Sequence, residues 1–138
     1  DARKQADLLD VVARMESASG QKANRLLALA WADQKRNLDV ALEAVEADLK
    51  IRQDVYTYDA LAWVRHQRGE YEAARGASRQ ALRFGTPEPL FHFHAGMIAH
   101  ALGDTAGAKT HLERALSLNP KFSVRHAPVV AATLRKLG

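Results

Sequence analysis

The strongest constraint on the fold is an internal repeat with a period of about 34 residues. Small residues recur at matching positions of two consecutive segments: Gly69, Ala74 and Ala81 in the first, and Gly103, Ala108 and Ala115 in the second. Small side chains at fixed positions let two helices approach closely, and a turn glycine between them ends the first helix. Units of this kind bury their apolar faces by stacking on one another. The sequence therefore predicts stacked antiparallel helix pairs around one continuous core.

Helical spacing of apolar residues and the helix start and stop signals locate the individual helices. We expect helices over residues 2–18, 21–34, 37–51, 55–68, 71–84, 89–102, 105–117 and 126–137. Asn37 and Asp104 are predicted N-caps, because their side chains can accept hydrogen bonds from free backbone N–H groups. Gly69, Gly85 and Gly103 are expected where helices end. No stretch shows sustained alternation of period two, so no sheet is expected.

The closing motif Ala-Leu-Ser-Leu-Asn-Pro at 115–120 and the Gly-Asp turn at 103–104 resemble the tetratricopeptide repeat family. The resemblance implies an all-α fold, a right-handed superhelix (α-solenoid) of stacked antiparallel helix hairpins with a C-terminal capping helix. It divides a single domain over residues 1–138 into a half repeat at 1–20, repeats at 21–54, 55–88 and 89–122, and a capping helix at 123–138. Looser likeness in residues 54–63 and 94–98 suggests the last repeats of a larger bacterial protein of this family.

The repeat at 21–54 departs from the family pattern in two places. Its turn, at Lys35 and Arg36, has no glycine and is one residue longer than the turns at Gly69 and Gly103. The late alanine of the second helix can be matched by either Ala47 or Asp48, so the register of that helix stays open.

The resemblance also implies where a partner would bind. In this family the concave face is lined by a few positions on the first helix of each repeat. Carried onto this sequence, those positions are Lys22, Arg25, Leu29, Tyr56, Asp59, Trp63, His66, Gln67, Leu90, Phe93, Met97 and His100. Tyr56, Trp63, Phe93 and Met97 would form an apolar stripe that accepts an extended peptide or an amphipathic helix. Alternatively, the chain's own ends or a neighbouring copy fill this face, and Trp63 belongs to the core.

The function that follows is a non-enzymatic protein-protein interaction scaffold or adaptor. We expect Trp63→Ala combined with Phe93→Ala to abolish partner capture and to leave the helical content intact. The chain has no cysteine, which excludes disulfides and thiolate metal sites. It also has no Gly-x-Ser-x-Gly motif and no phosphate-binding glycine loop, so it is not expected to be an enzyme. His92 and His94 lie on opposite sides of a helix, and neither a metal nor a cofactor is expected.

Two further functions stay open as alternatives. The isoelectric point of about 9.6 allows nucleic-acid binding through a basic surface, for which Arg65, Arg68, Arg75, Arg79 and Arg83 are the candidates. The N-terminal half repeat would leave an apolar face near Leu8, Val12 and Met15 uncovered, which favours self-assembly.

The compartment cannot be assigned from the residues. The sequence has no apolar run long enough to span a membrane and no signal peptide at its start. Without cysteines, the cytoplasm and the periplasm fit equally well. The chain opens on Asp1 rather than on methionine, which suggests a fragment or a processed product.

Overall fold

The computed structural model describes residues 20–123 and 126–138. These residues form seven helices and no strand, so the all-α prediction is confirmed for them. The helices are α2 (Gly20–Asp33), α3 (Leu38–Ile51), α4 (Val55–Gln67), α5 (Tyr71–Ala81), α6 (Pro89–Ala101), α7 (Thr105–Leu118) and α8 (Ala127–Leu137). The helix predicted over residues 2–18 lies outside the described residues.

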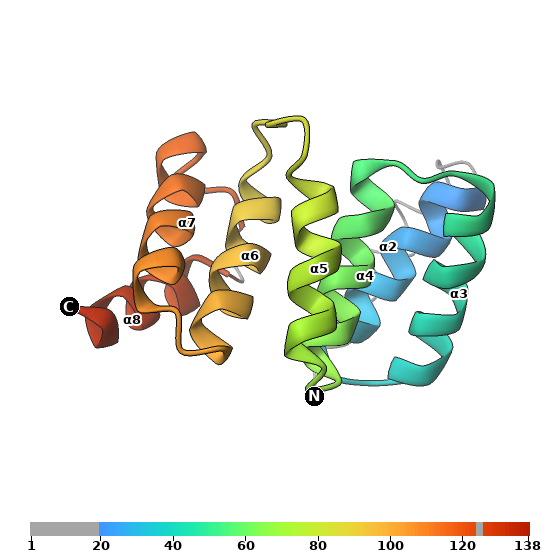
Figure 1. The fold of residues 1–138 in the computed structure, drawn as a ribbon, viewed down its shortest axis with the longest axis horizontal. Helices are drawn as coiled ribbons and strands as arrows, with labels where there is room; N and C mark the ends of the chain where they lie inside the picture. The colour runs from blue at the N-terminus through green and yellow to red at the C-terminus, as the bar shows by residue number, and fades with distance from the viewer. Residues whose placement is uncertain (1–19, 124–125) are drawn as a thin grey trace.

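Three helix pairs, α2–α3, α4–α5 and α6–α7, stack side by side, and α8 follows at the C-terminal end (Figure 1). The second helix of each pair turns three equivalent buried positions towards its partner. These positions are Ala41, Val45 and Asp48 in α3; Ala74, Ser78 and Ala81 in α5; and Ala108, Leu112 and Ala115 in α7. Asp48 therefore takes the late alanine position, which settles the register of α3.

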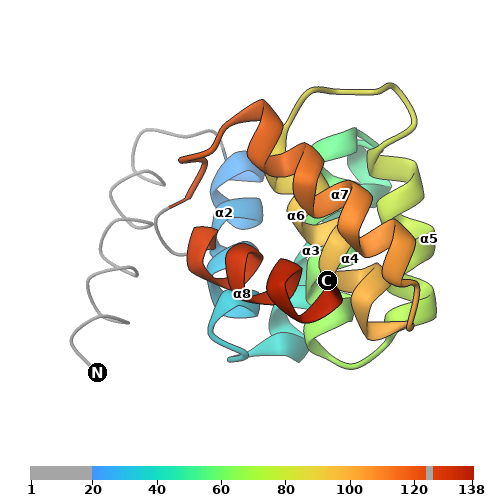
Figure 2. The ribbon, with the colours of Figure 1, turned by 90° about the vertical axis from the view of Figure 1, so that its left-hand side faces the viewer.

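The stack has an inner side formed by the first helices. Helix α4 packs against both α2 and α6, whereas α3, α5 and α7 make no comparable contacts with one another. A stack whose first helices lie closer together than its second helices curves around the first helices. We call the exposed side of α2, α4 and α6 the inner face. Figure 2 shows α8 on the side of the stack occupied by α2, opposite α5.

The turns follow the sequence prediction except in the first pair. Gly69 and Gly103 adopt positive φ angles of 84° and 80° after α4 and α6. In the glycine-free turn, Lys35 and Asn37 take left-handed conformations at φ 52° and 50° instead. Asn37 is the N-cap residue of α3, as predicted, but its side chain makes no capping hydrogen bond. The physical reason is that a capping side chain usually reaches the free N–H groups from extended backbone angles, whereas Asn37 is left-handed here.

The remaining helix ends are close to their predicted positions. The side chain of Asp104 accepts a hydrogen bond of 2.9 Å from the backbone N–H of Gly107, which confirms this N-cap. Gly85 has a positive φ of 66°, but it follows α5 by several residues, because α5 ends at Ala81 rather than at residue 84. A longer connection over residues 82–88 then leads into α6, which begins at Pro89.

Two helical glycines predict opposite responses to alanine. A Cβ at Gly96 would lie 2.7 Å from Cγ of the fully buried Leu112 and 3.3 Å from the carbonyl oxygen of Ala108. At Gly76, in the middle of α5, a Cβ would meet nothing within 4 Å. We expect Gly96→Ala to destabilise the protein by about 1–2 kcal/mol, since overpacking outweighs the gain in helix propensity. Gly76→Ala should stabilise it by up to about 1 kcal/mol. Urea unfolding followed by circular dichroism measures both, and equal effects would contradict the close approach of α6 and α7.

Candidate binding face

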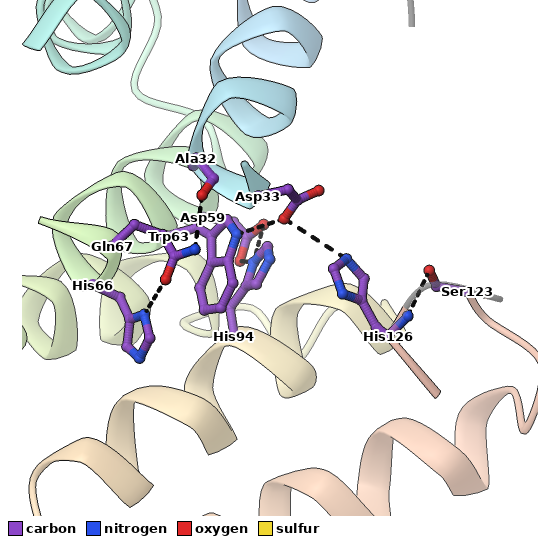
Figure 3. Close-up of polar contacts among 9 residues, drawn as sticks. All are labelled: Ala32, Asp33, Asp59, Trp63, His66, Gln67, His94, Ser123 and His126. Atoms are coloured by element: carbon purple, nitrogen blue, oxygen red, sulfur yellow. Dashed lines mark hydrogen bonds and ion pairs between the residues drawn. The ribbon is translucent and has the colours of Figure 1, made fainter. Parts of the chain in front are cut away.

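The centre of the inner face is a packed group of aromatic and charged side chains. We call Asp33, Asp59, Trp63, Phe93, His94 and His126 the inner cluster. They come from α2, α4, α6 and the residue before α8, so segments far apart in the sequence meet here (Figure 3). The repeat architecture explains this convergence, because equivalent positions of successive first helices lie next to one another.

His94 and Asp59 form the buried polar pair of the cluster. Nδ1 of His94 lies 2.9 Å from Oδ1 and 3.0 Å from Oδ2 of Asp59. Their exposed fractions are only 1% and 2%. A carboxylate in such a place costs several kcal/mol unless it is paired, so each residue depends on the other. The pair joins α4 to α6.

Trp63 connects this pair to α2. Its indole ring stacks on His94 with the ring centroids 4.3 Å apart, and on His66 at 4.7 Å. Its Nε1–H donates a hydrogen bond of 2.8 Å to Oδ1 of Asp33 (Figure 3). Burial raises the pKa of Asp33, and the Trp63 hydrogen bond partly offsets that rise. Beside it, Gln67 donates a hydrogen bond of 2.7 Å to the carbonyl oxygen of Ala32. These two hydrogen bonds, from Trp63 and Gln67, join the C-terminal end of α2 to α4.

The C-terminal part of the chain completes the cluster. The imidazole of His126 stacks on Phe93 at 4.4 Å, and its Nε2 lies 3.8 Å from Oδ1 of Asp33. Phe122 approaches the same Phe93 ring at 6.0 Å. Figure 3 shows Asp33 reached from one side by Trp63 and from the other by His126. Phe93 is therefore enclosed, with only 2% of its surface exposed.

The twelve residues expected on the concave face differ widely in exposure. Three are buried, namely Asp59, Trp63 and Phe93. Six are partly buried, namely Arg25, Leu29, His66, Gln67, Leu90 and Met97. Tyr56 and His100 are exposed, and the side chain of Lys22 lies outside the described residues. His94 and His126 were not among the expected residues, because no sequence pattern indicates that they would meet Asp59 and Asp33.

An accessible edge remains at the start of α4. Tyr56 is 43% exposed, and the guanidinium carbon of Arg25 lies 5.0 Å from the centre of its ring. The rings of Tyr56 and the buried Phe91 pack in a T-shaped arrangement with their centroids 5.4 Å apart, which fixes the position of Tyr56. An aromatic ring held beneath a cation offers both apolar contact and positive charge to a ligand.

The basic surface is largely neutralised in the middle of the stack. Within the described residues, Arg65, Arg68 and Arg75 all form ion pairs, with Glu46 and Glu70, with Asp39 and Glu70, and with Glu72, respectively. Arg83 donates instead to the carbonyl oxygens of Gln53 and Gln80. Four of the five candidate arginines thus have partners within the protein, which makes them less available to the phosphates of a nucleic acid.

His92 and His111 form a second polar pair on the opposite side of α6 from His94. Their Nδ1 atoms lie 3.1 Å apart, beside an open pocket of about 520 Å³. Within residues 20–123 and 126–138, no group of three or more potential ligands could hold a metal ion. Since one Nδ1 must donate and the other accept, at least one imidazole of the pair is neutral.

This pair predicts a loss of stability in acid. Burial lowers the pKa of both His92 and His111 below 6.5, and the neighbouring His111 adds to the effect on His92. Below pH 6.5 the folded protein therefore binds fewer protons than the unfolded chain, so the free energy of unfolding falls as the pH falls. The double variant His92→Gln/His111→Gln should lose less stability between pH 7.5 and pH 5 than the wild type in urea titrations. The surface variant His100→Gln is the matched control, and equal slopes for all three proteins would contradict the assignment.

No helix among the described residues has the length and apolar character needed to cross a bilayer.

The fold and the inner face together define a helical-repeat protein of the α-solenoid class. Residues 89–122 match the family model of the tetratricopeptide repeat, which is the span predicted for the third repeat. The fold of the chain is thus the tetratricopeptide-repeat fold, as the sequence predicts. The rest of the division into repeats, and the origin in a larger bacterial protein, stay predictions.

Solved structures with this fold include chaperones of type III secretion. The translocator chaperone SycD of Yersinia enterocolitica is 20% identical to this chain and has a TM-score of 0.68. The complex of SycD with a peptide of the translocator YopD has a TM-score of 0.67, and the match covers 88% of this chain and 95% of the SycD chain. PcrH of Pseudomonas aeruginosa is 23% identical, with a TM-score of 0.67 and coverage of 87% and 94%. PcrH with the chaperone binding region of PopD is 22% identical, with a TM-score of 0.64 and coverage of 93% and 91%. No curated protein has a sequence that matches this chain.

Proposed function

We propose that this protein is a non-enzymatic binding module that holds a peptide or helix of a partner protein on its inner face. The observation that carries the proposal is the accessible edge, where Tyr56 lies beneath Arg25 on a rigid base of packed rings. An exposed aromatic ring beside a cation is typical of the anchor points in protein interfaces. The site proposed for the partner is the set of twelve inner-face residues, with Tyr56, Arg25 and Leu90 as its first contacts.

The comparisons support this proposal through the fold alone. Two proteins with the same fold, SycD and PcrH, have been solved with a peptide of YopD and with the chaperone binding region of PopD. A curved stack of helix pairs offers a continuous surface to an extended or helical segment. The positive charge of Arg25 favours a partner segment that carries an acidic residue beside an apolar one.

The other candidate functions have less support. Nucleic-acid binding needs free cations in a row, and the ion pairs of Arg65, Arg68 and Arg75 remove three of the five proposed arginines from that role. Self-assembly through Leu8, Val12 and Met15 concerns residues outside the described part of the chain. An acid–base role for His94 and Asp59 is disfavoured by their burial, since a substrate could not reach them.

Photo-crosslinking tests the proposal directly. A photoreactive phenylalanine analogue at Tyr56 should crosslink to a partner protein in a lysate of the source organism. The matched control is the same analogue at Phe84, which is also an exposed aromatic residue, at 74%, but lies on the connection between α5 and α6. A defined protein adduct at position 56 and not at position 84 is expected. Adducts of equal yield at both positions, or with nucleic acid only, would refute binding at the inner face.

A further inference from the structure

The second and third helix pairs fill the same slot in different ways. The slot lies between the start of the first helix of a pair and the end of its second helix. In the second pair it holds the phenol ring of Tyr58, and the guanidinium carbon of Arg83 lies 5.3 Å from the centre of that ring. One period later in the sequence, His92 and Ser117 stand at these two positions. Both side chains are smaller, so they fill less of the slot in the third pair.

The unfilled part of this slot is the open pocket beside the histidine pair, which measures about 520 Å³. Its lining comes from α6 and α7 and consists of His92, Thr110, His111, Glu113, Arg114 and Ser117. Pockets of this size are typical of small-molecule sites. Because the pocket stands where the second pair seats the ring of Tyr58, it has the place for one aromatic ring from outside the chain.

The rim of the pocket supplies donors for an anionic group. Arg114 is exposed and forms no ion pair with any residue that the structure describes. Burial lowers the pKa of His92, and the charges of His111 and Arg114 add to the effect, so the guanidinium acts on the pocket itself. In the histidine pair, the ring that accepts through Nδ1 carries its own proton on Nε2. A guanidinium and an imidazole N–H are both strong donors to a carboxylate.

The acidic residues near the pocket do not reverse this preference. Glu113 lines the pocket, but its side chain is exposed, so water and salt screen its repulsion of an anion. Asp104 acts on His111, yet its carboxylate is already engaged as the N-cap of α7 through the N–H of Gly107. A cationic ligand would gain only Glu113 and would be repelled by Arg114. The charges therefore favour a ligand that is both aromatic and anionic.

We propose that the pocket between α6 and α7 binds a small aromatic carboxylate. Its ring takes the position that Tyr58 has in the second pair and packs against the imidazoles of His92 and His111. Its carboxylate accepts charge-assisted hydrogen bonds from Arg114. The site lies on the opposite side of α6 from His94, so it is separate from the inner face and does not depend on the partner binding proposed there.

Benzoate is the probe, and a chemical-shift titration of the nitrogen-15-labelled full chain both detects weak binding and locates it. Saturable shifts are expected for the backbone amides of the residues that line the pocket. Acetate carries the carboxylate without the ring, and benzyl alcohol carries the ring without the charge. Each should bind at least about tenfold more weakly than benzoate, because each lacks one of the two contacts. Equal affinity for acetate, or shifts confined to other parts of the chain, would overturn the proposal.

Two variants test the ring and the charge separately. His92→Tyr refills the slot with the side chain that the second pair accommodates, so it should abolish benzoate binding and keep the helical content in circular dichroism. Arg114→Gln, at the exposed rim, should weaken benzoate binding at least about fivefold. Lys109→Gln removes an exposed cation of α7 outside the pocket, and as the matched control it should leave the affinity unchanged. Wild-type affinity in Arg114→Gln, or in a folded His92→Tyr, would overturn the proposal.

Discussion

Replacing His94 by phenylalanine should lower the free energy of unfolding by about 3–5 kcal/mol, because it leaves the buried carboxylate of Asp59 without its partner. The two side chains are 1% and 2% exposed, and no hydrogen bond other than those from His94 is seen for the Asp59 carboxylate in the described part of the chain. Phenylalanine keeps an aromatic ring against Trp63, so the loss reports on the hydrogen-bonded pair of His94 and Asp59 rather than on stacking. Urea unfolding followed by circular dichroism gives the value.

The double variant His94→Phe/Asp59→Leu is the matched control for this pair. Removing both polar groups together should recover most of the stability, since no unpaired charge is left behind. Such recovery makes the double variant more stable than His94→Phe alone. If the loss of unfolding free energy in the double variant instead equals the sum of the losses in His94→Phe and Asp59→Leu, the two residues do not act as a pair.

Phe93→Ala should destabilise the protein by about 3–5 kcal/mol, the usual cost of removing a buried aromatic ring. Phe93 is 2% exposed and its ring packs against those of Trp63, His94, Phe122 and His126, so its loss opens a cavity between α4, α6 and the residues before α8. Thermal and urea unfolding measure the effect. Tyr56→Ala, at an exposed aromatic position of the same face, is the comparison and should cost less than half as much.

This burial changes the experiment that the sequence suggests. From the sequence, Trp63→Ala with Phe93→Ala should abolish partner capture and preserve the helices. With Trp63 at 5% and Phe93 at 2% exposure, that double variant would lose two core rings, and lost capture would report unfolding. Tyr56 and Arg25 are the positions at which binding can be tested without damaging the core. A fully folded double variant would show that the cluster contributes little to stability.

The placement of the helices follows from the sequence because its causes are local. Turn glycines such as Gly69 and Gly103 accept positive φ angles that other residues avoid. Pro89 favours the first turn of a helix, because its fixed φ angle is helical and it has no N–H to leave unpaired. The recurrence of Ala74 and Ala108 one period apart encodes close helix packing without reference to the rest of the chain. The exception, Asn37, lies in a turn whose backbone is set by its length and not by the capping residue.

The sequence by itself determined the class of fold and the order of the helices. Only the tertiary structure decided that Trp63 and Phe93 are buried, that His94 pairs with Asp59, and that His126 reaches Asp33. The physical reason is range: helix starts, turns and small-residue packing depend on neighbours within one repeat. The contacts of the inner cluster join residues one to three repeats apart, and they form only once the repeats have stacked and placed His126 beside Asp33 and Phe93.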